Sequence, residues 1–131
     1  MASLDDVAAI IAELPEVEDG ERHGTRTWFV NGKGFAWHRP FGKADLRRFG
    51  EVDPPSGPIL AVRVADLGEK EAVLAAGHPG VFTIPHFDGY AAVLIQLDVI
   101  GDPVLRELVI DGWLAYAPPA LARRYLDQRP L

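Results

Sequence analysis

The stretch Thr25-Arg-Thr-Trp-Phe-Val-Asn-Gly-Lys-Gly-Phe-Ala-Trp-His-Arg39 decides the fold of this chain. Two runs rich in aromatic and β-branched residues flank Asn31-Gly32, which is the preferred residue pair for a tight type I′ turn. The pattern therefore predicts a β-hairpin with strands over 25–30 and 33–39. Pro40 ends the second strand because proline has no N–H group to donate to a neighbouring strand.

The register of this hairpin follows from its two-residue loop. The expected cross-strand pairs are Val30 with Lys33, Trp28 with Phe35, and Arg26 with Trp37. Because side chains alternate along a strand, one face gathers Arg26, Trp28, Val30, Lys33, Phe35, Trp37 and Arg39, joined by Arg22 if the first strand extends backward. The opposite face carries His23, Thr25, Thr27, Phe29, Gly34, Ala36 and His38.

Two interpretations of the aromatic and basic face remain open. In the first, Trp28, Phe35 and Trp37 stack on bases while the cationic groups contact phosphates, as in proteins that bind single strands. In the second, the same rings form the core beneath helices, and the cationic groups reach water at the sheet margins. Large aromatic side chains usually lie inside a protein, which favours the second interpretation and leaves the smaller, polar face open.

Upstream of the hairpin, the sequence predicts one helix followed by a loop. Ser3 is a good N-cap, apolar residues follow at helical spacing up to Leu14, and Pro15 ends the pattern. The acidic stretch Glu16–Glu21 comes next. We expect it to be a solvated loop.

Downstream of the hairpin, three further strands alternate with helices. The predicted elements are a short helical turn over 43–49, a connecting loop over 51–58, strands over 59–64, 81–84 and 90–97, helices over 66–77 and 102–116, and an amphipathic turn over 120–126. Together with the hairpin, they predict a single α+β domain over residues 1–131. Its expected order is α-β-β-β-α-β-β-α, with the helices on one face of a two-layer antiparallel sheet.

Five stretches of the chain resemble the MmcQ/YjbR-like family. They are Leu14-Pro-Glu-Val17, Gly24-Thr-Arg-Thr-Trp-Phe-Val30, Phe35-Ala-Trp37, Thr83-Ile-Pro-His-Phe-Asp-Gly-Tyr90 and Asp111-Gly-Trp-Leu-Ala115. The resemblance covers about residues 4–126 and implies a compact two-layer domain similar to secretion chaperones, with antiparallel strands. Members of the family are often labelled DNA-binding because of a double-wing likeness. The resemblance implies no catalytic residues.

Composition argues for a cytoplasmic protein without disulfides. The chain has no cysteine, which excludes disulfide bonds, thiolate metal sites and cysteine nucleophiles. No apolar run approaches the ~20 residues that a bilayer-spanning helix needs. The N-terminus carries Asp5 and Asp6 where a signal peptide has basic residues. We therefore expect a cytoplasmic protein that does not interact with membranes.

The net charge of −6 hides an uneven distribution of charged residues. Residues 1–21 hold seven acidic groups and no lysine or arginine, whereas residues 22–48 hold seven basic groups against one acid, Asp45. A cationic segment of this kind is a candidate contact for the phosphates of nucleic acid. The expected contact residues are Arg22, Arg26, Lys33, Arg39, Lys43, Arg47 and Arg48. The alternative is that these charges only solvate the surface.

Motifs for catalysis or cofactor binding are missing from the sequence. The four histidines form no i, i+4 pair of the kind that binds zinc on a helix, and neither Ser3 nor Ser56 stands in a Gly-x-Ser-x-Gly turn. Asn31-Gly-Lys-Gly34 lacks the spacing of a phosphate-binding loop. We therefore expect a binding protein without metal or cofactor, with nucleic acid as its first candidate partner. An enzyme of unrecognised type is a third possibility, because a site on a sheet face can lack a sequence motif.

A small molecule or another protein is the alternative partner, bound on the open face of the sheet or at the turn that carries His86 and Asp88. The expected inward residues of the two central strands are Leu60, Val62, Val64, Val93, Ile95 and Leu97. Alternation then turns Arg63 and Gln96 outward. The residues of the alternative site are His23, His38, Arg63, His86, Asp88 and Gln96. Two of them lie in the turn Pro85–Gly89, where Asp-Gly is also ordinary turn chemistry.

Overall fold

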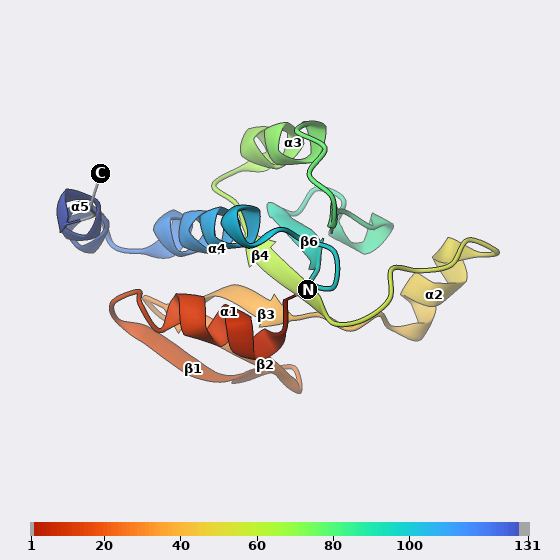
Figure 1. The fold of residues 1–131 in the computed structure, drawn as a ribbon, viewed down its shortest axis with the longest axis horizontal. Coiled ribbons are helices and arrows are strands. Elements are labelled where there is room, and N and C mark those ends of the chain that lie inside the picture. The colour runs from red at the N-terminus through yellow and green to blue at the C-terminus, as the bar shows by residue number, and fades with distance from the viewer. Residues whose placement is uncertain (1, 129–131) are drawn as a thin grey trace.

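The structure is a computed structural model that describes residues 2–128 of the chain. Six strands form one antiparallel sheet in the order β1-β2-β3-β4-β6-β5, with helices packed against it (Figure 1). The elements in chain order are α1 (Leu4–Ile11), β1 (Val17–Arg22), β2 (Thr25–Val30), β3 (Lys33–His38), α2 (Lys43–Phe49), β4 (Ile59–Arg63), α3 (Leu67–Ala75), β5 (Val81–Phe82), the 3₁₀ helix η1 (Pro85–Phe87), β6 (Ala92–Gln96), α4 (Asp102–Tyr116) and α5 (Pro119–Gln128). The predicted α+β class is confirmed. Within the described residues, none of the helices has the length and apolar character that crossing a bilayer requires.

The sheet begins with a strand that the sequence pattern did not predict. Residues Val17–Arg22 form β1 at the edge of the sheet, so the expected loop over Glu16–Glu21 is wrong. Most residues of β1 are exposed, and no apolar alternation marks the strand. A signal that could have revealed it is His23-Gly24, whose φ angles of 54° and 78° make a two-residue turn like that at Asn31-Gly32. Hydrogen bonding to β2 holds β1 in place, and apart from the half-buried Val17 its side chains are exposed.

A β-bulge changes the register of the predicted hairpin. The Asn31-Gly32 turn and the pair of Val30 with Lys33 are confirmed. Further from the turn, the pairs are Phe29 with Gly34, Trp28 with Ala36, and Thr27 with Trp37. Phe35 is the extra residue, and two predicted pairs are therefore wrong: Trp28 with Phe35, and Arg26 with Trp37. Beyond the bulge, each side chain of β3 lies on the face opposite to the predicted one.

The first face of the sheet is buried beneath α1 and α4. Trp28 and Phe35 of the hairpin lie there with Val7 of α1 and Trp113 of α4. The central strands contribute the residues predicted to point inward, which confirms that prediction: Leu60, Val62, Val64, Val93, Ile95 and Leu97. Helix α4 packs tightly on the sheet at Gly112, where a Cβ atom would lie 3.1 Å from the carbonyl oxygen of Arg63 and 3.2 Å from that of Phe35.

The second face of the sheet is covered over part of its area. A separate buried cluster contains Ile59, Ala61, Ile84, Phe87, Ala92 and Leu94, and the residues packed against it are Trp37, Phe41, Phe49 and Phe82. Because Phe49 belongs to α2 and Phe87 to η1, the expectation that all helices lie on one face is wrong. Strands β4 and β6 are buried on both sides, and strands of that kind have nearly continuous apolar sequences.

Candidate ligand-binding site

The residues predicted to contact nucleic acid do not form one strip on this fold. Arg22 ends β1 beside the first hairpin turn, whereas Lys33 begins β3 beside the second. The length of β2 separates these two turns by ~17 Å. Lys33 stacks on the ring of Tyr116, with 5.2 Å between its Nζ atom and the ring centroid. Two of the expected contacts therefore lie at opposite ends of the hairpin.

Two of the expected arginines are paired with carboxylates. Arg26 donates to the two carboxylate oxygens of Asp19 at 3.2 and 2.7 Å. This interaction lowers the pKa of Asp19 and raises the pKa of Arg26. Arg39 donates to Asp45 at 3.0 Å and to the carbonyl oxygen of Pro40 at 2.6 Å. Both guanidinium charges are therefore already compensated within the protein.

The other three expected cations lie on α2, which projects from one end of the sheet (Figure 1). Lys43, Arg47 and Arg48 are exposed, and none of them has a carboxylate within ion-pair distance among residues 2–128. Lys43 and Arg47 stand one turn apart, on the side of the helix away from the buried Asp45. Their charges therefore face solvent and not the sheet.

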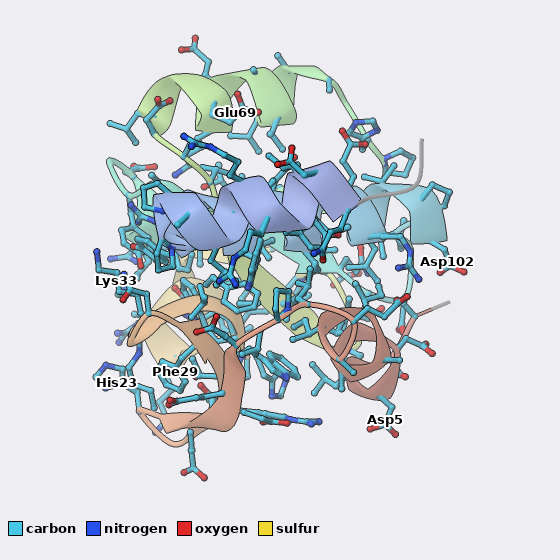
Figure 2. The ribbon with its side chains drawn as sticks, turned by 90° about the vertical axis from the view of Figure 1, so that its left-hand side faces the viewer. Asp5, His23, Phe29, Lys33, Glu69 and Asp102 are labelled. Atoms are coloured by element: carbon cyan, nitrogen blue, oxygen red, sulfur yellow. The ribbon has the colours of Figure 1, made fainter. Side chains whose placement is uncertain are left out.

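A pocket of about 680 Å³ opens on the second face, between the β1–β2 turn and η1. Its lining residues are Arg22, His23, Thr25, Thr27, Trp37, Arg39, Pro40, His86, Phe87 and Tyr90. In Figure 2, the turn that carries His23 lies on the opposite side of the hairpin from α1, which Asp5 marks. A pocket of this size, with apolar walls and a few polar groups, is typical of small-molecule sites.

Three aromatic rings form the apolar wall of this pocket. The ring centroids of Trp37 and Phe87 lie 6.4 Å apart with their planes inclined by 26°, and the ring of Tyr90 packs at 6.3 and 5.6 Å from them. Phe87 is buried, Trp37 is half-buried and Tyr90 is 39% exposed. The wall therefore runs from the core to the surface and offers aromatic contact area to a flat ligand.

Arg22 brings a charge without a carboxylate partner to the pocket. Its guanidinium carbon lies 5.7 Å from the ring centroid of Phe29 and 5.8 Å from that of Trp37. No carboxylate among residues 2–128 forms an ion pair with it. A Cβ atom on Gly34 would lie 2.8 Å from the Nη2 atom of Arg22. Gly34 therefore leaves the space that this guanidinium occupies.

Arg39 is the second arginine of the pocket, and α2 holds it in place. Its guanidinium carbon lies 5.6 Å from the ring centroid of Phe87. Its partner Asp45 is 5% exposed and also accepts a hydrogen bond from the N–H group of Gly42 at 2.9 Å. Burial raises the pKa of Asp45, but the hydrogen bonds from Gly42 and Arg39 outweigh burial and hold that pKa below its ordinary value. The charged carboxylate therefore ties the pocket to α2.

Two residues of the alternative site, His23 and His86, line the pocket, and the others lie elsewhere. His38 pairs with Leu60 and so lies on the first face, because cross-strand partners share a face. Gln96 donates to the carbonyl oxygen of Ser56 and ties down the loop before β4.

Arg63 and Asp88 also lie outside the pocket lining. The guanidinium of Arg63 is placed between the rings of Tyr90 and Tyr116, at 5.0 and 5.1 Å from their centroids. Asp88 is exposed on the turn after η1. Among residues 2–128, no group of three or more histidine or acidic side chains is placed to hold a metal ion.

Reasoning from the sequence missed the aromatic wall. The bulge at Phe35 hid Trp37, because the simple register places it on the first face with Trp28. Phe87 and Tyr90 belong to the turn whose His86 and Asp88 were assigned to the alternative site, but their rings were not counted among its residues. Their chemistry was a usable signal, since two aromatic residues within one short turn are candidates for a binding site.

Proteins of known sequence and structure give the class of this chain. A search of protein-family models finds no match. The crystal structure of Deinococcus radiodurans protein DR2400, which carries a DUF419 domain, has a TM-score of 0.61 at 18% sequence identity and covers 98% of this chain and 91% of that chain. The molecule is therefore an α+β domain with the DUF419 fold, which is the fold of the MmcQ/YjbR-like proteins.

Two mycobacterial proteins are similar over nearly their whole length. They are the uncharacterised proteins Rv2570 of Mycobacterium tuberculosis and Mb2600 of Mycobacterium bovis. Each is 46% identical over 130 residues, which cover 96% of this chain and 97% of the relative. This chain belongs to the same family as these mycobacterial proteins.

Proposed function

We propose that this protein binds a small anionic molecule with a flat aromatic part, in the pocket between the β1–β2 turn and η1. The observation that supports this proposal is the composition of the pocket. Aromatic rings form one wall, two arginines and two histidines surround them, and none of the lining residues is acidic. An anion in the pocket therefore meets no like charge at its wall, although the whole chain carries a net charge of −6.

The chemistry of Arg22 favours a carboxylate or a phosphate as the charged group of the ligand. A guanidinium offers a planar fork of N–H donors that matches two such oxygens. Arg22 stacks near two rings and has no carboxylate partner among residues 2–128, so its donors are not committed to a protein carboxylate. The aromatic wall beside it suits the flat part of the same molecule.

Membership in the MmcQ/YjbR-like family is a part of this proposal. Its support is the shared DUF419 fold together with the family-like stretches of the sequence. One of these stretches, Thr83–Tyr90, contains the turn that supplies His86, Phe87 and Tyr90 to the pocket. The family-like stretch and the proposed site therefore overlap.

An NMR titration tests the proposed ligand class. Of the three tryptophans, Trp28 and Trp113 are 2% and 0% exposed, so Trp37 is the indole that a ligand in the pocket contacts. We expect benzoate and adenosine 5′-monophosphate, which are flat anions, to shift the indole N–H signal of Trp37. Inorganic phosphate and neutral benzamide at equal concentration are expected to shift it less. If neither flat anion binds at millimolar concentration, the proposal is rejected.

A pair of variants links this binding to the pocket. Arg22→Gln removes the unpaired charge, and because a hydrogen bond to a charged group contributes about 1.5–3 kcal/mol, the affinity for benzoate should fall by roughly tenfold or more. Lys33→Gln is the matched control, since Lys33 is an exposed cation that stacks on Tyr116 outside the pocket. The control should leave affinity unchanged. Equal losses in both variants would mean that net charge, and not the pocket, attracts the anion.

Nucleic acid is a second candidate partner, and the exposed cations of α2 favour it. Lys43, Arg47 and Arg48 have no ion-pair partner among residues 2–128. Fluorescence anisotropy with labelled single-stranded and duplex DNA at several salt concentrations tests this candidate. The double variant Arg47→Glu, Arg48→Glu should weaken binding and flatten its salt dependence, because fewer phosphates are neutralised. The adjacent pair Arg123→Glu, Arg124→Glu on α5 is the control with the same charge change, and identical affinities in both double variants reject the candidate.

A further inference from the structure

Lys70 is a buried lysine that contacts the pocket wall from behind. It lies on α3 and is 7% exposed. Its ammonium donates hydrogen bonds to the carbonyl oxygen of Phe87 at 2.6 Å and to that of Tyr90 at 2.8 Å. These two residues supply two of the three rings of the pocket wall, whereas Lys70 is not among the lining residues.

Burial of this ammonium requires a reason, because removing a charge from water is unfavourable. Burial lowers the pKa of Lys70, and the nearby charge of Asp88 opposes that effect in part. A methionine has a similar length and would fill the same space without a charge. What the lysine adds is a set of donors that holds two carbonyl groups at one point.

The other hydrogen bonds of this turn are local. The N–H group of Phe87 donates to Ile84, that of Asp88 to Pro85, that of Tyr90 to Phe87 and that of Ala92 to Tyr90. A bond to another part of the chain follows just after the turn, where Val64 donates to Ala91. The local bonds shape the turn but do not join Phe87 or Tyr90 to a helix. Lys70, which is 17 and 20 positions away from its two partners, joins the turn to a helix.

We infer that Lys70 is a positioning residue of the pocket, which anchors the carbonyl groups of Phe87 and Tyr90 and so sets how their rings face Trp37. Its effect on a ligand rests on the proposed function, but its effect on the rings is a property of the free protein. Helix α3, which Glu69 marks in Figure 2, is thereby linked to a pocket that it does not line.

The substitution Lys70→Met tests the inference in the ligand-free protein first. Without the ammonium, the rings of the turn lose their fixed orientation, so the indole N–H signal of Trp37 should shift or broaden while that of the distant Trp113 stays in place. Affinity for benzoate and for adenosine 5′-monophosphate should fall, because the rings that contact the ligand are no longer held in one orientation. Arg123→Met removes an exposed cation of α5 outside the pocket lining and is the control, with no change in either measurement.

Chemical rescue of a cysteine variant distinguishes a positioning role of Lys70 from a packing role. Because the chain has no native cysteine, an introduced cysteine is the single thiol that the reagent can alkylate. Lys70→Cys is alkylated in the unfolded state and refolded. Treatment with 2-bromoethylamine restores an ammonium at nearly the reach of lysine, whereas treatment with 1-iodopropane gives an uncharged side chain of similar size. The aminoethyl form should recover the native Trp37 signal and the affinity, and the propyl form should not.

Three results distinguish the positioning role of Lys70 from the proposed ligand class. Native Trp37 signals in both Lys70→Met and the propyl form overturn the positioning role, whatever the ligands do. Equal rescue by the aminoethyl and propyl groups also overturns it, because the side chain would then act by filling space. A Trp37 signal that depends on the ammonium, in a protein that binds neither flat anion, supports the positioning role and rejects the proposed ligand.

Discussion

Gly34 and Arg22 determine at the scale of single residues where the pocket charge lies. A glycine within a strand costs about 0.5–1 kcal/mol relative to alanine, so its presence calls for a reason. Here, a Cβ atom would lie 2.8 Å from the Nη2 atom of Arg22 and 3.0 Å from the Cγ2 atom of Thr27. The guanidinium needs that space in order to lie near Trp37.

We expect Gly34→Ala to keep the fold and to displace Arg22. The closest contact is with the far end of the flexible Arg22 side chain, which can move, whereas the methyl group of the buried Thr27 has to give by only a few tenths of an ångström. Stability should therefore change by less than about 1 kcal/mol. Affinity for benzoate should fall as it does in Arg22→Gln. Urea unfolding and the NMR titration measure the two effects.

Gly20→Ala is the control for this substitution. A Cβ atom at Gly20 would lie 3.4 Å from the ring of Phe29, which is an ordinary contact, and no atom of Arg22 lies within 4 Å of it. The control variant should bind benzoate like the native chain. An equal loss of affinity in both variants would show that strand stiffness, and not displacement of Arg22, is responsible.

Among the secondary-structure elements, α2 depends most clearly on tertiary contacts. A helix of this length is marginal in water by itself. Phe49 packs it onto the second face, and Asp45 links it to Gly42 and Arg39. Loss of Asp45 should therefore loosen α2 and release one arginine of the pocket.

Asp45→Asn should reduce the free energy of unfolding at pH 7 by about 1–3 kcal/mol, because a charged hydrogen-bond partner is lost. The pKa of Asp45 is lowered by folding, so its contribution is present above the ordinary value of 3.8 and is lost as the pH falls through the folded pKa. The difference between the native chain and the variant should therefore narrow below pH 3.8.

Urea unfolding at pH 7 and at pH 3 checks this prediction, with Asp19→Asn as the control. Asp19 forms an exposed pair with Arg26, and exposed pairs contribute about 0–1 kcal/mol. Similar losses in the two variants at pH 7 would contradict a special role for Asp45.

Elements with a strong local signal were predictable from the sequence, and those held by pairing alone were not. Asn31 and Gly32 both adopt the positive φ angles that a tight hairpin turn requires. The helix caps at Ser3 and Asp66 form hydrogen bonds within the first turn of their own helices. The strand Val17–Arg22 carries no apolar alternation, and its partner strand decides its conformation. The bulge at Phe35 leaves this ring buried in the same cluster as Trp28, and a simple register does not include an extra residue of this kind.

At the scale of the whole molecule, the two buried clusters share their central strands. Val62 and Val93 face the helices on one side of the sheet, while Ala61 and Leu94 face α2 and η1 on the other. If β4 and β6 separate, both buried clusters are exposed to water at the same time. We therefore expect one cooperative unfolding transition for both faces.

Indole N–H signals in increasing urea test this cooperativity. Trp113 reports on the first face and Trp37 on the second. Both signals should disappear with the same midpoint. Separate midpoints for the two tryptophans would show that the second face and its pocket open independently of the helix-covered core.

The pocket was less predictable than the fold because its parts are far apart in the sequence. Arg22, Trp37 and Phe87 come from β1, β3 and η1, and they meet only after the sheet has formed. The sequence placed His23 and His86 in one candidate site, but it also placed His38 there, which the bulge turns to the first face. The spacing of these residues along the chain does not indicate that the fold brings them together.

The two borders of the sheet bear on how this protein behaves at high concentration. One border, β5, is only two residues long, and the other, β1, carries Glu18, Asp19 and Glu21. A second molecule that extended the sheet through β1 would bring two sets of carboxylates together, and short or charged borders resist such strand addition. Fibril growth by border-to-border stacking of sheets is therefore disfavoured while these carboxylates carry their charge.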